Sequence, residues 1–113
     1  MTDDEARQLV ENARLATSDA TFDPVPLIRI KVADSDASWL VTEIDPDDHD
    51  LAYGLADAGI GLPEQGHFRL STLADATGAL GGRAERDRSF KPAPGMTLAV
   101  LARIAHTAGR IVV

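Results

Sequence analysis

The 113-residue sequence predicts an α+β fold, with an antiparallel sheet of about four or five strands and a helix near each end of the chain. Two observations lead to this prediction. Apolar residues recur with helical spacing close to both termini, whereas several short segments between them alternate apolar and polar residues. The links between these segments are short and rich in Asp, Pro and Gly, which is typical of antiparallel neighbours. We expect a single domain spanning residues 1–113.

The first helix is predicted from Thr2 onward, because Thr2 and Glu5 have the spacing of a capping box. One apolar stripe follows at helical intervals: Ala6, Leu9, Val10, Ala13 and Ala16. The helix should end near residue 17, before the Asp23-Pro24 step.

Three strands are predicted over residues 27–32, 38–44 and 51–56, with a short fourth strand over 67–70. Strict alternation in the second strand would place Trp39, Val41 and Glu43 on one face. Asp45-Pro46-Asp47-Asp48 predicts the turn that follows it, since proline favours the second turn position.

In the second half of the chain the predicted elements are short and are separated by loops. Residues 59–66 are predicted as a loop, and Ser71 as the N-cap of a short helix over 71–76 that ends before Gly78. Residues 83–90 are charged on both faces, which suits an edge strand. A final helix is predicted over 97–108 and ends at Gly109, and its inner stripe contains Leu98, Leu101, Ile104 and Ala105.

The net charge of −7 is unevenly distributed. Residues 1–66 carry 15 acidic and 4 basic side chains, whereas residues 67–113 carry 3 acidic and 7 basic ones. The acidic excess makes nonspecific nucleic-acid binding unfavourable, although Arg83, Arg86, Arg88 and Lys91 can form a local basic face. We expect the two halves to pair their charges.

Composition excludes several classes of chemistry. There is no cysteine, which rules out disulfides, thiolate catalysis and cysteine-ligated metals. No apolar run approaches the roughly 20 residues that span a bilayer, and the acidic start Met-Thr-Asp-Asp-Glu opposes a secretory signal. We therefore expect a cytoplasmic protein.

The densest polar cluster is residues 43–50, which hold five carboxylates. Alternating carboxylates can bind Mg²⁺ or Ca²⁺, but the spacing lacks the glycine and final glutamate of a calcium loop. We expect a solvated turn in which Asp side chains accept hydrogen bonds from nearby backbone N–H groups, and no metal or cofactor.

Recognised catalytic motifs are missing from the sequence. His49, His67 and His106 form no paired motif, the serines have no nucleophile-elbow setting, and the glycines have no phosphate-loop spacing. A His67–Glu64 base pair can be imagined, but no nucleophile motif accompanies it.

Glu85-Arg86-Asp87-Arg88 would place its two arginines on one face of a strand, where they can hold a carboxylate or phosphate. The charge asymmetry favours pairing with Glu43 or with the loop 45–50. We assign no catalytic residue. The candidate binding residues are Trp39, Glu43, Asp45, Arg86 and Arg88.

Several motifs between residues 25 and 95 resemble a family of uncharacterised bacterial domains. They are Trp39-Leu-Val-Thr-Glu43-Ile-Asp45-Pro46, Tyr53-Gly54-Leu55, Gly66-His-Phe68-Arg-Leu70-Ser71, Glu85-Arg86-Asp87 and Phe90-Lys91-Pro92. The resemblance implies a domain of unknown function that is often found on plasmids and other mobile elements. The helix from Thr97 looks additional to the part of the chain that carries the resemblance, about residues 25–95.

Three functions remain open. The first is a non-catalytic accessory protein of a plasmid or mobile element that acts through protein contacts. The second is a small metal- or carboxylate-dependent enzyme that uses Glu43, Asp45 and the Arg86/Arg88 face, and the third is an acidic inhibitor that mimics nucleic acid. Because Val100 and residues 111–113 have no obvious place in a small core, we also expect a homodimer through the C-terminal helix and tail.

Overall fold

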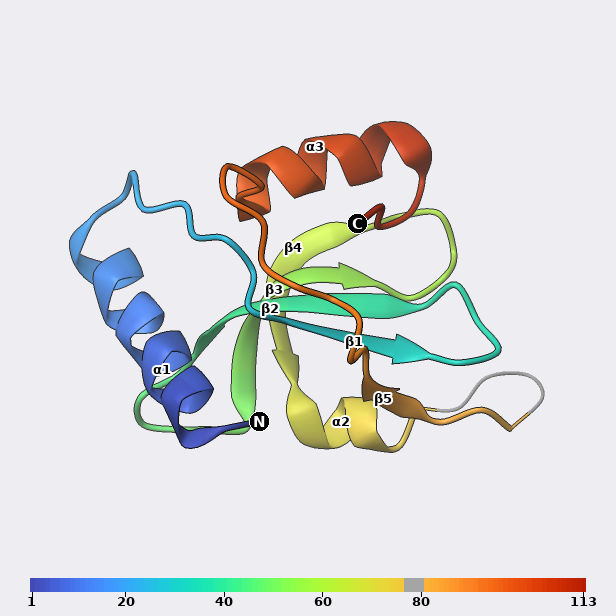
Figure 1. Cartoon of the computed structure of the whole chain (residues 1–113), viewed down its shortest axis with the longest axis horizontal. Coiled ribbons are helices and arrows are strands. Elements are labelled where there is room, and N and C mark those ends of the chain that lie inside the picture. Colours follow the sequence, from blue (N-terminus) through green and yellow to red (C-terminus); the bar gives the residue numbers. More distant parts are fainter. Residues whose placement is uncertain (77–80) are drawn as a thin grey trace.

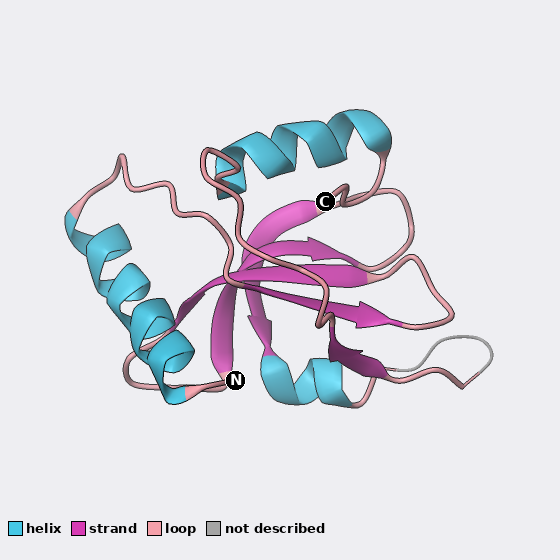
Figure 2. Cartoon of the chain, viewed as in Figure 1, coloured by secondary structure: helices cyan, strands magenta, loops and turns pink. Residues whose placement is uncertain are grey.

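The computed structural model describes residues 1–76 and 81–113 and confirms the α+β arrangement (Figures 1 and 2). In chain order the elements are α1 (Asp3–Ser18), β1 (Ile28–Val32), β2 (Ser38–Ile44), β3 (Leu51–Asp57), β4 (Glu64–Arg69), α2 (Leu70–Ala74), β5 (Ala84–Arg86) and α3 (Leu98–Ala108).

The five strands form one sheet in the order β4-β3-β2-β1-β5, and every pairing is antiparallel. The helix α3 covers one face, where its apolar side packs on Leu40 and Leu55. The helices α1 and α2 pack against the opposite face, through Leu9 and Leu73 respectively. Both faces of the central strands are therefore buried.

The helix α1 begins at the predicted capping box. Thr2 Oγ1 accepts a hydrogen bond from Glu5 N at 3.1 Å, and Glu5 Oε1 accepts one from Thr2 N at 3.0 Å. Leu9 is fully buried against the sheet, and the neighbouring buried residue Asn12 donates from Nδ2 to the Thr42 carbonyl at 3.0 Å. This polar contact holds α1 over β2 at the point where the strand is irregular.

A β-bulge between Val41 and Glu43 changes the predicted faces of β2. Val41 pairs with Gly54 and Glu43 pairs with Tyr53, so Thr42 is the extra residue on the β2 side. The prediction that Trp39 and Glu43 share a face is wrong, because the bulge moves Glu43 to the α3 face while Trp39 stays on the α1/α2 face. Alternation cannot be carried across an inserted residue.

The connection from β4 to α2 also differs from the sequence-based prediction. Glu64–Gly66 belongs to β4 and not to a loop, since Glu64, Gln65 and Gly66 pair with Ala56, Leu55 and Gly54. The helix α2 starts at Leu70, and Ser71 lies within it, where its N–H and hydroxyl both donate to Asp50. The helix α2 ends at Ala74, two residues before the predicted end at residue 76, and Gly78 lies outside the described residues.

The strand β5 is shorter than predicted, because only Ala84–Arg86 pairs with β1. In α3 the buried residues are Leu98, Leu101, Ala102 and Ala105, whereas Ile104 is 38 % exposed. Successive residues of a helix are rotated by about 100°, so Ala102 lies closer than Ile104 to the centre of the apolar stripe that contains Leu98 and Ala105. The prediction that Ile104 belongs to the inner stripe is therefore wrong.

The chain after α3 turns back onto the sheet. Gly109 ends α3 with a φ of 74°, in the left-handed region that glycine adopts without strain. Ile111 is then buried and donates its N–H to Asp57 Oδ2 at 3.1 Å. Among the described helices, none is long and apolar enough to cross a membrane.

Candidate functional site

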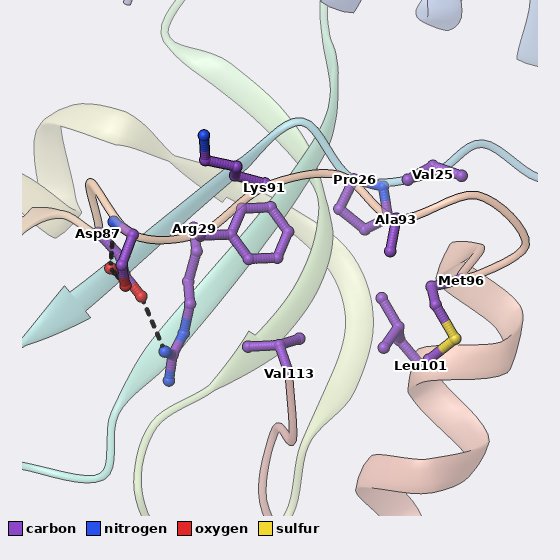
Figure 3. Close-up of a pocket in the computed structure, with 11 residues that line it drawn as sticks. Val25, Pro26, Arg29, Asp87, Lys91, Ala93, Met96, Leu101 and Val113 are labelled. Carbon is purple, nitrogen blue, oxygen red and sulfur yellow. Dashed lines mark hydrogen bonds and ion pairs between the residues drawn. The ribbon is translucent and has the colours of Figure 1, made fainter.

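A pocket of about 410 Å³ lies on the α3 face, between the approach to β1, the connector that follows β5, and α3 itself (Figure 3). Its apolar lining is Val25, Pro26, Phe90, Ala93, Met96, Leu101 and Val113, and its polar lining is Arg29, Asp87, Ser89 and Lys91. Figure 3 shows Asp87 and Arg29 at one end, Met96 and Leu101 at the other, and Val113 between them. We call this the connector pocket.

Prolines and short backbone contacts shape the connector pocket. Leu98 N donates to the Pro24 carbonyl at 2.9 Å, and Ala99 N donates to Asp23 Oδ1 at 3.0 Å, so the start of α3 is tied to the segment before β1. A turn in the connector is closed by Met96 N donating to the Ala93 carbonyl at 3.0 Å. These hydrogen bonds fix the start of α3 and the connector beside the segment that precedes β1.

The polar end of the connector pocket is organised by Asp87, whose side chain is only 6 % exposed. Ser89 donates to Asp87 Oδ1 from its N–H at 3.0 Å and from its hydroxyl at 2.7 Å. Arg29 Nη1 donates to Oδ2 at 3.0 Å, and Lys31 Nζ lies 3.7 Å from Oδ1. The Ser89 hydrogen bonds, aided by Arg29 and Lys31, lower the pKa of Asp87 to about 2.

Asp87 therefore stays ionised and fixes the Arg29 guanidinium beside the apolar lining. A guanidinium has five N–H donors, and the hydrogen bond to Asp87 uses one of them. Lys91 adds an exposed ammonium at the rim. The connector pocket can thus hold an apolar group with an adjacent carboxylate, a combination typical of small binding sites.

A second cleft of about 310 Å³ lies between the later turns of α1 and the end of the sheet. Its floor is a row of three side chains on adjacent strands, because Glu43 on β2 is paired with Tyr53 on β3 and Tyr53 with His67 on β4. Its remaining lining residues are Ala13, Arg14, Thr17, Asp45, Pro46 and Leu51. We call this the Glu43 cleft.

Burial raises the pKa of Glu43, and the nearby charge of His67 opposes this in part. The rings of Tyr53 and His67 meet edge to face, with centroids 4.9 Å apart. The imagined partner of His67, Glu64, is three residues away on the same strand and so points to the opposite face. Glu43 is the carboxylate that the fold brings to His67.

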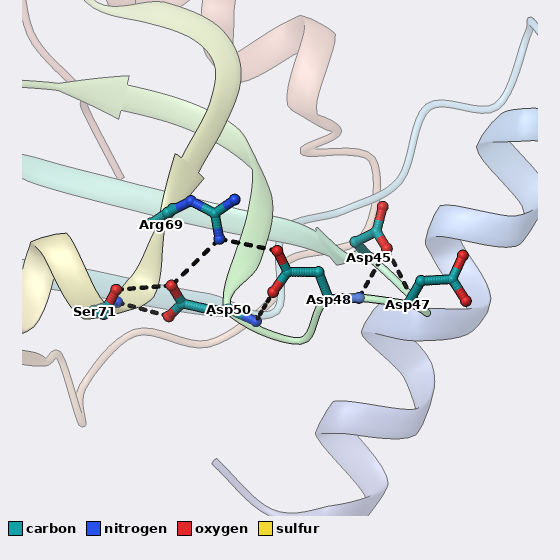
Figure 4. A network of polar contacts seen from close by, with 6 residues as sticks. All are labelled: Asp45, Asp47, Asp48, Asp50, Arg69 and Ser71. Atoms are coloured by element: carbon teal, nitrogen blue, oxygen red, sulfur yellow. Dashed lines mark hydrogen bonds and ion pairs between the residues drawn. The ribbon is translucent and has the colours of Figure 1, made fainter.

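The acidic loop after β2 is a hydrogen-bonded turn (Figure 4). Asp45 Oδ1 accepts hydrogen bonds from Asp47 N at 2.8 Å and Asp48 N at 3.0 Å, as the sequence predicted. Arg69 Nη1 lies 2.9 Å from Asp48 Oδ2 and 3.6 Å from Asp50 Oδ2, and Ser71 donates twice to Asp50. Hydrogen bonds from Arg69 and Ser71 respectively lower the pKa of Asp48 and of Asp50.

The structure does not gather the five candidate residues into one site. Glu43 and Asp45 line the Glu43 cleft, whereas Trp39 is 9 % exposed and packs near Leu73 of α2. Arg86 pairs with Glu5 at 2.5 Å rather than with Glu43 or the acidic loop, because β5 is an edge strand and β1 separates it from β2, the strand that carries Glu43. Arg88 lines a shallow depression with Arg86 at that edge.

Sequence reasoning missed Arg29, Asp87, Phe90 and Met96 as parts of one pocket. The signal was the pair of proline-rich segments, 24–26 and 92–95, which enclose it from two sides. Among residues 1–76 and 81–113, no group of three His, Asp or Glu side chains is arranged to hold a metal ion.

The model of one protein family matches residues 1–112, nearly the whole chain, and its description reads "Protein of unknown function (DUF2958)". The chain belongs to this family. The DUF2958 match includes both terminal helices, so the expectation that the resemblance stops near residue 95 is wrong. A search of curated proteins and a search of solved structures found no match.

Proposed function

We propose that this DUF2958 protein is a non-catalytic accessory protein that binds a partner protein through the connector pocket. The observation that carries the proposal is the composition of this pocket, in which an apolar lining lies beside the fixed Arg29 guanidinium and the exposed Lys91. Such a pocket suits an apolar anchor side chain with a carboxylate next to it. Anchors of this kind supply most of the binding energy in protein interfaces.

An apolar surface close to the pocket supports the same proposal. Ile60 and Leu62, in the loop between β3 and β4, are 72 % and 66 % exposed, and Val112 and Val113 are 40 % and 56 % exposed. The loop lies beside the point where α3 ends and the tail begins, since a Cβ built on Gly61 would be 3.9 Å from the Gly109 carbonyl oxygen. Exposed apolar side chains concentrated in one region are typical of interaction surfaces.

We propose separately that this loop-and-tail surface forms a homodimer. Ile111 is already buried in its own chain, so Val112 and Val113 are the tail residues available to a second copy. In sedimentation at micromolar concentration we expect a dimer, and a monomer for Ile60→Lys whose circular dichroism spectrum shows that it remains folded. A wild-type monomer at that concentration contradicts the dimer and leaves the pocket proposal intact.

A role on a plasmid or another mobile element rests on the sequence resemblance alone, and we retain it as part of the proposal. The alternative hypothesis of an enzyme that combines Glu43 and Asp45 with Arg86 has less support. These two carboxylates line the same cleft, but Arg86 forms its ion pair with Glu5. The nucleic-acid mimic also loses support, since Arg69 lies against Asp48 and Asp50 and neutralises part of the acidic loop.

The test is capture of partners from a lysate of the source organism by immobilised protein, followed by mass spectrometry. Ala93→Glu places a bulky carboxylate at the mouth of the connector pocket, and Ala99→Glu makes the same change on an exposed residue of α3 that does not line it. We expect one or a few proteins to be retained by wild type and Ala99→Glu and lost with Ala93→Glu. Equal retention by all three would overturn the proposal.

A further inference from the structure

We propose that the Glu43 cleft binds a small organic cation of the alkylammonium class, with the Glu43 carboxylate as its counter-charge. The inference concerns a site away from the connector pocket and does not depend on the proposed function. The β-bulge in β2 places Glu43 in one row with Tyr53 and His67.

Glu43 differs from the other carboxylates whose pKa is clearly shifted. Glu5, Asp19, Asp48, Asp50 and Asp87 each accept hydrogen bonds from an arginine or a hydroxyl group, and the pKa of each is lowered. Glu43 is half-buried, and its pKa is raised because burial removes water from the carboxylate. No hydrogen bond or ion pair reaches it from the residues that the structure describes.

A partly desolvated carboxylate without a donor is unfavourable to the fold, and a cation in the adjacent space relieves this cost. The cleft has room for a short aliphatic chain, since about 310 Å³ is available beside Tyr53, Leu51, Pro46 and Ala13. An aromatic ring and aliphatic carbons next to Glu43 suit an alkylammonium ion better than a bare metal ion, which requires several oxygen ligands, since Asp45 Oδ1 already accepts two backbone hydrogen bonds.

Other charged groups around the cleft either favour or oppose a bound cation. Asp45 adds negative charge from the turn after β2, whereas Arg14 of α1 and the charge of His67, which acts on Glu43, oppose a cation. The Arg14 guanidinium is largely exposed and lies 3.9 Å from Glu11 Oε2, so it is directed along α1. Binding should therefore strengthen as the pH rises through the raised pKa of Glu43, because the carboxylate then becomes charged.

The test is a titration with n-butylammonium chloride at pH 8, followed by backbone amide NMR shifts of the full chain. 1-Butanol serves as the neutral ligand of equal size. We expect saturable shifts at residues 43, 53 and 67 with n-butylammonium and none with 1-butanol. Glu43→Gln should weaken binding about tenfold or more, since the counter-charge is lost, and Arg14→Gln should strengthen it.

The matched control is Glu64→Gln, which removes the same charge from an exposed residue outside the cleft and should leave affinity within about twofold. The proposal is overturned if Glu43→Gln, with an otherwise unchanged spectrum, binds as tightly as wild type. It is also overturned if the shifts centre on residues 47–50, because binding would then belong to the acidic loop. Shifts that centre on the connector pocket would overturn it as well, because n-butylammonium would then bind there and not beside Glu43.

Discussion

Arg86 and Glu5 form a two-pronged ion pair between β5 and the first turn of α1, with hydrogen bonds of 2.8 and 2.5 Å. The two residues are 81 positions apart, and both side chains are about one-quarter exposed. The same Glu5 carboxylate closes the capping box of α1. One side chain thus starts a helix and ties that helix to the last strand of the sheet.

Glu5→Gln isolates the ion pair, because glutamine can still accept the capping hydrogen bond from Thr2. We expect the free energy of unfolding to fall by about 1–2 kcal/mol, as for a charge-assisted pair that is partly shielded from solvent. Urea denaturation measures this change. Arg86→Gln should give a similar loss and the double variant no further loss, whereas additive losses would contradict a direct pair.

Acid sensitivity should follow from Glu5 and Asp87, whose pKa values of about 2 lie below their ordinary values of 4.5 and 3.8. A lowered pKa contributes stability that is present above the ordinary value and lost as the pH falls towards the folded value. We expect the free energy of unfolding to decrease from about pH 4.5 to pH 2. The decrease should be shallower in Glu5→Gln, and an equal slope would contradict the assignment.

Gly54 is required by the close approach of β2 at the bulge. A Cβ built at this position would lie 1.8 Å from the carbonyl oxygen of Leu40, which is backbone and cannot rotate away. We expect Gly54→Ala to destabilise the protein by more than about 3 kcal/mol or to prevent folding. Gly66→Ala on β4 is the control, since no described atom lies within 4 Å of its Cβ. Similar melting temperatures for both variants would show that the bulge is misplaced.

Glu43 should reduce stability at neutral pH. Its raised pKa means that the folded state favours the protonated acid. The stability that comes from protonated Glu43 is therefore fully present at low pH, and it is lost as the pH rises through the folded pKa. We expect Glu43→Gln to raise the melting temperature at pH 7 and to have little effect at pH 4. A lower melting temperature at pH 7 would instead indicate a structural role. Stability gained by removing a side chain is typical of a group kept for binding.

The sequence predicts the elements well where local signals and packing agree. The capping box at Thr2 and Glu5 and the glycine at 109 mark helix ends that the structure confirms. The register of β2 could not be predicted, because a β-bulge depends on the partner strand and on the contact from Asn12 to Thr42, 30 residues away. One inserted residue then reversed the face of Glu43.

The candidate site was predicted only in part for a similar reason. Charge complementarity between the halves of the chain is real, but it cannot specify which residues meet. Arg86 forms an ion pair with Glu5, and Asp87 forms one with Arg29, because β5 joins the sheet beside β1. The strand order depends on long-range pairing, which period-two patterns do not encode.

The measurement that tests the proposed function most directly is an NMR titration of the connector pocket with N-acetyl-leucine, an apolar side chain beside a free carboxylate. We expect saturable shifts at Phe90, Met96 and Val113, at least about tenfold weaker binding of N-acetyl-leucinamide, and loss of binding in Ala93→Glu but not in Ala99→Glu. Equal binding of the acid and the amide, or shifts that Ala93→Glu leaves unchanged, would contradict the account.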